Sequence, residues 1–372
     1  MFELTDRQSA LIEEAARFSS SYAGPVEAAG ADSSLRIFRD FCEHGYQALL
    51  VPERYGGKGL DYTTAGLIYE ELGYGYLPVM PSILTTTHCV EFVKIAGAEA
   101  VKHSLFAMTA NDRIPLGFGL TEEMAGSDIA AIQCRAERRN GGFTLSGRKT
   151  VVLNSLIAGA YVIIATTAPG TGRAGLNAFI VDADAPGVVR KAPYDGLGFK
   201  NTVVGEIELN DVSLAEGAML GDEGSGYFTL METFDKCRPF VAACCVGAAR
   251  RVFDTIVEHS KAREQMGKPL FSFQGISFRL ADFAARLRAS RLLYLEALSL
   301  VDRGLAFTME ASIAKLYASE TLRDLAEFGL EVLGYRGIYR DNPVRDIFMD
   351  AQLLISIDGS SNVQRMIIAS QL

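Results

Sequence analysis

The spacing of hydrophobic residues changes twice along the chain, and this limits the possible folds more than any other feature of the sequence. Up to about residue 112 the apolar residues recur at helical intervals, for example over 11–18. Between about 115 and 215, short β-branched and aromatic runs such as 160–164 and 177–181 are separated by Gly, Pro and Asn. Such runs, with no long helix between them, are typical of strands in a small sandwich or barrel. From about residue 224 the helical spacing returns in longer runs.

These regions predict an α+β protein in three parts. We expect an N-terminal helical domain over 1–113, a central β-sandwich or β-barrel domain over 114–220 and a C-terminal four-helix bundle over 221–372. Thr5-x-x-Gln8 is a capping box for the first helix. In the last part, helices are expected over 226 to about 261 with a kink at Pro239, and over 276–301, 308–330 and 344–355, with a short one after Gly359.

The composition excludes several classes of protein. With 49% hydrophobic residues, the chain of 372 residues has enough apolar surface to fold, so it is not a disordered protein. A net charge of −9, with no basic run longer than a pair, argues against nucleic-acid binding. No apolar run is long enough to span a membrane, and residues 1–6 lack the features of a signal or transit peptide. We therefore expect a cytoplasmic protein.

The cysteine and histidine patterns argue against a metal site. None of the six cysteines has CxxC spacing, and the four histidines form no HxxxH pair, so zinc is not expected. We expect the cysteines to be small buried hydrophobes in a reducing compartment. A GxGxxG after a strand, a GxxxxGK[ST] loop and a GxSxG motif are also missing from the sequence. Composition and periodicity therefore indicate no particular chemistry.

Three short segments carry a more specific signal. They are Leu120-Thr121-Glu122-Glu123-Met124-Ala125-Gly126-Ser127-Asp128, Phe234-Asp235-Lys236-Cys237-Arg238-Pro239, and Arg263-Glu264-Gln265-Met266-Gly267-Lys268-Pro269-Leu270 with Gln274 just beyond. Their order, and the spacing of about 140 residues between the first and the third, resemble the acyl-CoA dehydrogenase family of flavoproteins over nearly the whole chain. The resemblance implies the same order of helical, β and four-helix domains. It also implies FAD, extended between the β domain and the C-terminal helices and across a subunit interface.

The resemblance implies which residues contact FAD. Small residues around Gly126 let backbone N–H groups approach the flavin and its pyrophosphate, although 126–128 alone reads as a plain turn. Arg263 matches an arginine that pairs with the diphosphate of a neighbouring subunit's FAD, although alone it reads as a solvated residue at a helix end. The implied FAD contacts are Phe118, Leu120, Thr121, Gly126, Ser127, Val151, Leu153, Arg263, Gln274, Glu331, Gly334, Ser360 and Asn362.

Some of these positions depart from the family pattern. Leu153 stands where the family often has a threonine that bonds flavin N5, so a backbone N–H would have to replace that bond. Glu331 replaces a glutamine near the diphosphate and would repel phosphate unless it points away or is protonated. Ser360 and Asn362 are milder changes. These departures indicate a divergent member of the family.

The resemblance places the catalytic base near the C-terminus. The family's Tyr-Glu-Gly-Thr-Ser sequence corresponds to Ile357-Asp358-Gly359-Ser360-Ser361, which makes Asp358 the base. Some relatives carry a glutamate on an earlier helix, where this chain has Cys237, and a thiol cannot replace it at neutral pH without activation. Alone, 358–360 reads as the N-cap turn of the last helix. The residues implied to lie near the substrate are Ser127, Asp235, Arg238 and Gly359.

The implied activity is FAD-dependent α,β-dehydrogenation of an acyl thioester, carried by CoA or by an acyl-carrier protein. A carboxylate removes the α-proton, and the β-hydrogen leaves as hydride to flavin N5. The electrons would pass to an electron-transfer flavoprotein or to oxygen. The lost N5 contact and the shorter base leave two alternatives open: a flavin oxidase or monooxygenase that acts, for example, on nitroalkanes, and a catalytically silent subunit. Because Arg263 would serve a neighbour's FAD, the resemblance also implies a homodimer or homotetramer.

Overall fold

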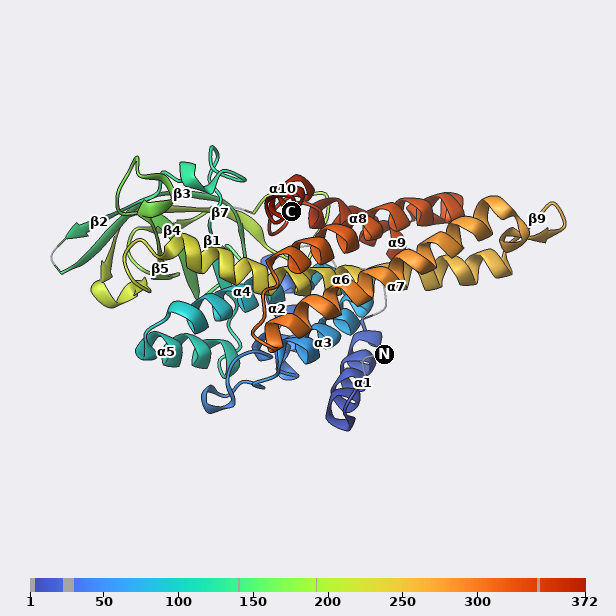
Figure 1. Cartoon of the computed structure of the whole chain (residues 1–372), viewed down its shortest axis with the longest axis horizontal. Helices are drawn as coiled ribbons and strands as arrows, with labels where there is room; N and C mark the ends of the chain where they lie inside the picture. The colour runs from blue at the N-terminus through green and yellow to red at the C-terminus, as the bar shows by residue number, and fades with distance from the viewer. Residues whose placement is uncertain (1–3, 23–29, 140, 192, 340–341) are drawn as a thin grey trace.

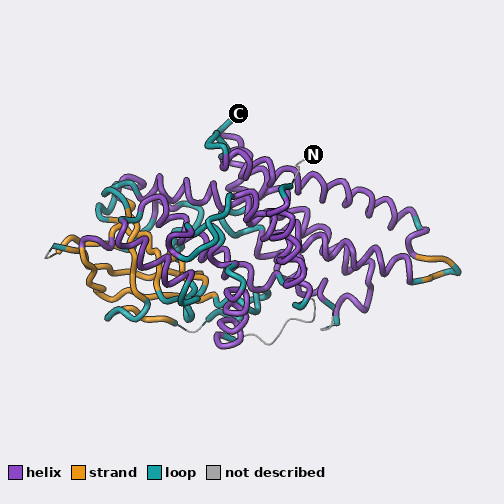
Figure 2. Tube along the Cα trace, turned by 90° about the horizontal axis from the view of Figure 1, so that it is seen from below, coloured by secondary structure: helices purple, strands orange, loops and turns teal. Residues whose placement is uncertain are grey.

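Helices form the two ends of the chain and strands form its middle, in the order that the hydrophobic spacing predicts (Figure 1). The computed structural model describes residues 4–22, 30–139, 141–191, 193–339 and 342–372. The strands of the central region gather at one end of the molecule, and the longest helices extend towards the other, where a small two-stranded hairpin connects two of them (Figure 2). The predicted α+β fold class is confirmed.

The N-terminal helices include one that is buried along most of its length. In chain order the helices are α1 (Asp6–Ser20), α2 (Ala31–Glu43), α3 (Tyr62–Gly75), α4 (Met80–Ala96) and α5 (Glu99–Ala110). The predicted capping box is present at the start of α1, where Thr5 and Gln8 bond each other's backbone N–H groups. Every residue of α4 from Met80 to Val93 is buried, although several of these side chains are polar. Buried polar side chains need hydrogen-bond partners, so α4 can present functional groups where these partners face a cavity.

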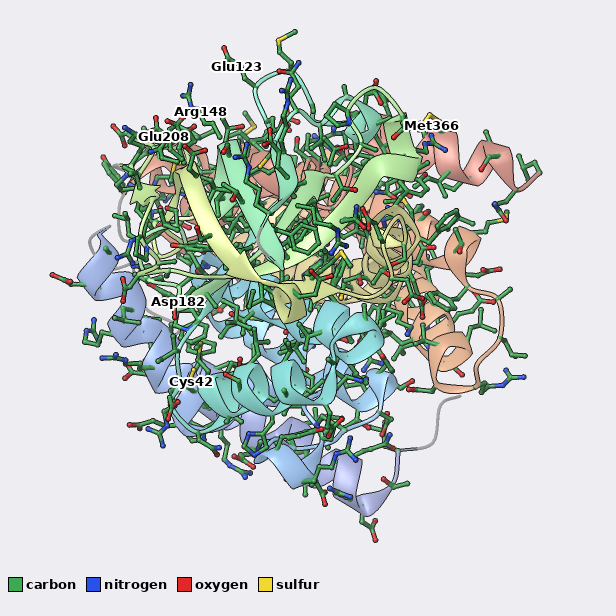
Figure 3. All side chains as sticks on the ribbon, turned by 90° about the vertical axis from the view of Figure 1, so that its left-hand side faces the viewer. Cys42, Glu123, Arg148, Asp182, Glu208 and Met366 are labelled. Atoms are coloured by element: carbon green, nitrogen blue, oxygen red, sulfur yellow. The ribbon has the colours of Figure 1, made fainter. Side chains whose placement is uncertain are left out.

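The middle of the chain forms one sheet with the strand order β6-β7-β3-β2-β4-β5-β8, to which β1 adds by pairing in parallel with β4. Arg148 of β3 and Glu208 of β7 are register partners and lie next to each other at one edge of the view in Figure 3. The register between β3 and β7 shifts between Lys149 and Val152, which marks a β-bulge. The strands are β1 (Leu116–Gly119), β2 (Arg135–Arg139), β3 (Gly142–Leu153), β4 (Ala160–Thr166), β5 (Leu176–Asp182), β6 (Val188–Arg190), β7 (Val204–Ala215) and β8 (Met219–Leu220).

Long helices form the C-terminal region. They are α6 (Gly226–Ala262), α7 (Gln274–Asp302), α8 (Thr308–Leu333), α9 (Pro343–Leu354) and α10 (Ser361–Ser370). A small hairpin of β9 (Glu264–Gln265) and β10 (Lys268–Pro269) lies at the far end of this bundle (Figure 1). Short 3-10 helices connect the larger elements: η1 (Tyr46–Ala48), η2 (Glu53–Tyr55), η3 (Leu77–Val79), η4 (Ile129–Ala131), η5 (Gly172–Gly175), η6 (Glu216–Ala218), η7 (Leu270–Ser272) and η8 (Gly334–Ile338).

Two hydrophobic cores meet along α4 and α6. On α4, Leu84 belongs to the core of the helical bundle, whereas Cys89 belongs to the core beneath the sheet. On α6, Leu230 packs in the sheet core and Cys237 in the bundle core. The residues between these points lie at the junction of the two cores. This junction is where a cleft between the domains is expected to hold a ligand.

Two further expectations concern membranes and thiols. Among the described residues, no helix is long and apolar enough to cross a membrane. All six cysteines lie within the described residues, and each is a free, buried thiol, as predicted. Burial raises the pKa of these thiols, for example that of Cys134 to about 11, so they are unreactive side chains that fill space.

Candidate active site

A cavity of about 1360 Å³ lies where the sheet, α4, α6 and the turn before α10 meet. It is larger than the pocket that a single small ligand fills, which is roughly 300–1,000 Å³. Most of the residues expected to contact cofactor or substrate line it: Phe118, Leu120, Thr121, Gly126, Ser127, Val151, Leu153, Arg238, Asp358, Gly359 and Ser360. Residues from β1, β3, α6 and the C-terminal turn are thus brought to one space from distant parts of the chain.

The other predicted residues lie elsewhere. Asp235 is not among the residues that line the cavity; it pairs with Arg238 and accepts a hydrogen bond from Thr308 at 2.7 Å. Asn362 is exposed in the first turn of α10. Neither side chain lines the cavity of this chain, and their predicted contacts with substrate and FAD stay predictions.

The remaining predicted residues gather at the far end of the bundle. Arg263 follows the last residue of α6, Gln274 begins α7, and Gly334 follows α8. Glu331 is exposed, and its carboxylate forms an ion pair with Arg279 at 2.6 Å. Its side chain therefore points towards a basic residue of its own chain. None of these four residues lines the cavity of its own chain, so a ligand confined to that cavity would not contact them.

The segment after β1 is held by a buried ion pair. Lys149 Nζ lies 2.6 Å from Glu122 Oε1 and donates to the Leu120 carbonyl at 3.0 Å. The backbone N–H of Thr150 donates to the Thr121 carbonyl at 2.8 Å. Beyond this anchored stretch, a Cβ added at Gly126 would meet no heavy atom within 4 Å. The backbone there is open to a ligand, which fits a loop that a cofactor approaches closely.

A bulge in β3 brings a strained residue to the cavity. Val151 has φ +51° and is half exposed, and Leu153 is two residues further along the same strand. A β-branched residue rarely adopts positive φ, and such strain is concentrated at functional sites. Because Leu153 has no hydrogen-bonding side chain, it can bond a ligand here only through its backbone groups.

The turn that carries Asp358 is fixed by side chains from three helices. Asp358 has φ +56°, in the left-handed region. Its carbonyl accepts from Arg238 Nε at 3.2 Å and from Gln364 Nε2 at 2.9 Å. Lys315 Nζ, which is buried, donates to the Gly359 carbonyl at 3.0 Å. The N-cap reading of this turn is also correct, since Ser360 caps α10.

The side chain of Asp358 pairs with His88. Asp358 Oδ2 lies 2.7 Å from His88 Nε2, and the two side chains are only 10% and 6% exposed. Burial raises the pKa of Asp358, but the charge and hydrogen bond of His88, and then the charges of Arg238 and Lys315, outweigh it and leave that pKa below 3.8. Burial lowers the pKa of His88, but Asp358 outweighs it and leaves that pKa above 6.5. The two groups therefore form an imidazolium–carboxylate pair.

Sequence reasoning missed His88, which it treated as an isolated histidine. His88 lines the cavity and lies between Leu84 and Cys89, where α4 passes from one core to the other. Its partner is 270 residues away in the sequence. The sequence offered one signal, a histidine inside the helical run 82–95, and that signal identifies no partner.

Matches to family models cover the chain in three consecutive stretches. The N-terminal, middle and C-terminal domains of acyl-CoA dehydrogenase match residues 5–112, 117–212 and 224–372. The chain belongs to the acyl-CoA dehydrogenase family. The family membership predicted from the three motifs is confirmed, and with it the class of enzyme, a flavoprotein oxidoreductase.

Individual members of the acyl-CoA dehydrogenase family are similar over the full length. The chain is 31% identical to the probable acyl-CoA dehydrogenase YngJ of Bacillus subtilis over 377 residues, covering 100% of this chain and 99% of the relative. Butyryl-CoA dehydrogenase from Megasphaera elsdenii has a TM-score of 0.93 and 29% identity, with 100% and 99% coverage. PigA, solved with FAD and proline, has a TM-score of 0.93 and 25% identity, with 100% and 98% coverage.

Proposed function

We propose that this acyl-CoA dehydrogenase family member removes two hydrogens from the α and β carbons of an acyl thioester, with FAD as its cofactor and Asp358 as its base. The observation that carries the proposal is the position of the Asp358 carboxylate. It lines the same cavity as the loop 118–127 and the β3 bulge. A substrate bound in this cavity beside the cofactor could therefore contact the base.

The residues of the cavity fit FAD. The space of about 1360 Å³ has room for a dinucleotide and a substrate together. The open backbone at Gly126 and the bulge at Val151 offer N–H groups rather than side chains, and Phe118 and Leu120 offer apolar surface. When bound, FAD supplies the acceptor for the β-hydride.

The chain's own residues supply the proton chemistry. Asp358 is ionised at neutral pH, because its pKa is held below the usual value, so it can accept a proton. Arg238, Lys315 and Gln364 fix the turn and thereby the position of the carboxylate. Leu84, Met231 and Phe234 give the cavity an apolar lining, which would limit the access of water to a bound substrate.

We propose that the enzyme is a homodimer or homotetramer in which the far end of the bundle completes a neighbour's cofactor site. Arg263, Gln274 and Gly334 lie at this end. Large apolar side chains surround them and are exposed in the single chain, which supports a protein contact there. These side chains, here called the bundle-end patch, are Met266, Phe271, Phe278, Tyr335, Ile338 and Tyr339.

The free, buried thiols support a reducing, cytoplasmic location. The substrate's carrier is CoA or an acyl-carrier protein, and the electrons leave to an electron-transfer flavoprotein or to oxygen. Anaerobic titration of the flavin absorbance with thioesters on both carriers distinguishes the carriers. Peroxide formation in air distinguishes the acceptors.

The decisive experiment is anaerobic bleaching of the flavin by a panel of acyl thioesters, with Asp358→Asn as the test variant. Asparagine keeps the oxygen that accepts from His88 but cannot take a proton, so bleaching should fall by roughly 10³-fold or more while FAD stays bound. Asp282→Asn, an exposed change on α7, is the matched control and should bleach at the wild-type rate. Bleaching by Asp358→Asn at the wild-type rate would remove Asp358 from its proposed role.

A further inference from the structure

The hydrogen bonds of His88 fix how many protons the pair with Asp358 holds. Nδ1 lies 2.5 Å from the carbonyl oxygen of Leu84, which can only accept, so Nδ1 carries a hydrogen. Nε2 lies 2.7 Å from Asp358 Oδ2. With Nδ1 already protonated, this second contact requires one more proton between the ring and the carboxyl group. The arrangement shown is therefore that of a pair which has taken up a proton.

Several charged groups face this pair from the helices packed around it. Arg238 and Asp235 come from α6 and Lys315 from α8. Cys237, also on α6, is a buried thiol whose pKa burial raises well above the usual range, so it stays neutral. An apolar neighbour is Phe234, whose ring stands edge-on to His88 with ring centroids 5.9 Å apart. Two groups beside Asp358 can change their charge between about pH 6 and about pH 9: His88, and Lys315, whose pKa burial lowers to about 8.

We propose that His88 and Asp358 act as one proton-holding pair, in which His88 is a positioning residue that sets the base strength of Asp358. The inference rests on the proposed function of Asp358. It adds a second residue to the proton transfer, and it predicts which protonation state of the pair starts the reaction.

The reaction must start from the pair that has lost its extra proton, with neutral His88 and ionised Asp358. The α C–H bond then breaks, the proton goes to Asp358, and it comes to rest between Oδ2 and Nε2. The electron pair stays on carbon and forms the Cα=Cβ bond as the β-hydrogen leaves as hydride to the bound flavin. If the pair already held its proton, a second one would leave a net positive charge in a buried site beside Arg238, which is unfavourable.

The test is the rate of flavin bleaching in single turnovers, measured from about pH 6 to about pH 9. For the wild type we expect the rate to rise up to about tenfold per pH unit and then to level off, because only the deprotonated pair reacts. His88→Gln keeps an N–H that donates to Oδ2 but has no titrating proton, so its rate should lose the rise that His88 gives the wild type and keep only a change near pH 8 from Lys315. His103→Gln, an exposed change on α5, is the matched control and should keep the wild-type profile. An identical pH profile for His88→Gln and the wild type would overturn the proposal.

A second readout does not depend on turnover. Because the pKa of folded His88 is raised, its pairing stabilises the fold fully below about pH 6.5, and this stabilisation is lost as pH rises through the raised pKa. The melting temperature of the wild type should therefore exceed that of His88→Gln by more at about pH 6 than at about pH 9. In the Asp358→Asn background this pH dependence should vanish, and its persistence there would overturn the pairing. If no thioester bleaches the flavin, the proposed function fails, while this melting comparison still decides whether the pair exists.

Discussion

The buried ion pair of Lys149 and Glu122 offers the sharpest test of how the cofactor loop is held. The Lys149 side chain is fully buried and Glu122 is 9% exposed, with 2.6 Å between Nζ and Oε1. Glu122 also accepts from the backbone N–H groups of Gln133 and Cys134, at 2.7 and 3.0 Å. Lys149→Met would remove the cation and leave this carboxylate buried with its backbone partners alone.

The expected cost follows from the unpaired charge. Breaking a buried pair by removing one partner costs about 3–5 kcal/mol, because the remaining charge stays desolvated. For a chain of 372 residues the unfolding entropy is about 0.8 kcal/mol/K. A loss of about 4 kcal/mol therefore lowers the melting temperature by about 5 °C. Since Lys149 also bonds the Leu120 carbonyl, FAD affinity should fall as well.

The free energy of unfolding is measured by urea titration, and FAD affinity by quenching of flavin fluorescence. Glu122→Gln combined with Lys149→Met removes the buried charge and should recover part of the lost stability. Lys191→Met is the matched control, because Lys191 pairs with Glu208 at 3.1 Å on the same sheet but is 43% exposed. An exposed pair contributes about 0–1 kcal/mol. A loss below about 1 kcal/mol for Lys149→Met would refute the reasoning.

Two further predictions concern α9 and assembly. Burial raises the pKa of Asp350 to about 7, so stability should fall as pH rises from about 4 to about 7. Asp350→Asn should then be more stable than the wild type by roughly 1–3 kcal/mol at about pH 8, and no more stable at about pH 4. Urea titrations at the two pH values measure this difference. Equal gains at the two pH values would contradict the raised pKa of Asp350. Ile338→Asp in the bundle-end patch should lower the mass seen in sedimentation, whereas Val189→Asp on β6 should not; an unchanged mass for Ile338→Asp would exclude this end as the interface.

Much of the fold follows from the spacing of apolar residues. A helix facing one core repeats its apolar positions every 3.6 residues, and a strand every two. The helix expected from Gly226 to about Lys261 is α6, which ends at Ala262, and the strand expected at 160–164 is part of β4. Such periodicity says which face of an element is buried, but not which other element covers it.

Part of the candidate site could also be predicted from the sequence, and part could not. The motif around Gly126 and the residue pair Asp358-Gly359 were predicted to lie in the site, and both line the cavity. Such short segments can be recognised in the sequence, because their backbone conformations favour particular residues such as glycine. The sequence does not show that Asp235 pairs with Arg238 and is not among the residues that line the cavity, because the orientation of its side chain depends on how α6 packs. No local pattern carries that information.

By itself, the sequence determined the order of helices and strands, the family and the acidic residue near the C-terminus. Each of these can be recognised from residues that are close together in the sequence. Only the tertiary structure decided that His88 meets Asp358, that Lys315 holds its turn, and that both lie where two cores join. The physical reason is that the pKa of a buried group depends on the groups packed against it. Packing brings together residues that are far apart in the chain, so the sequence alone does not show these neighbours.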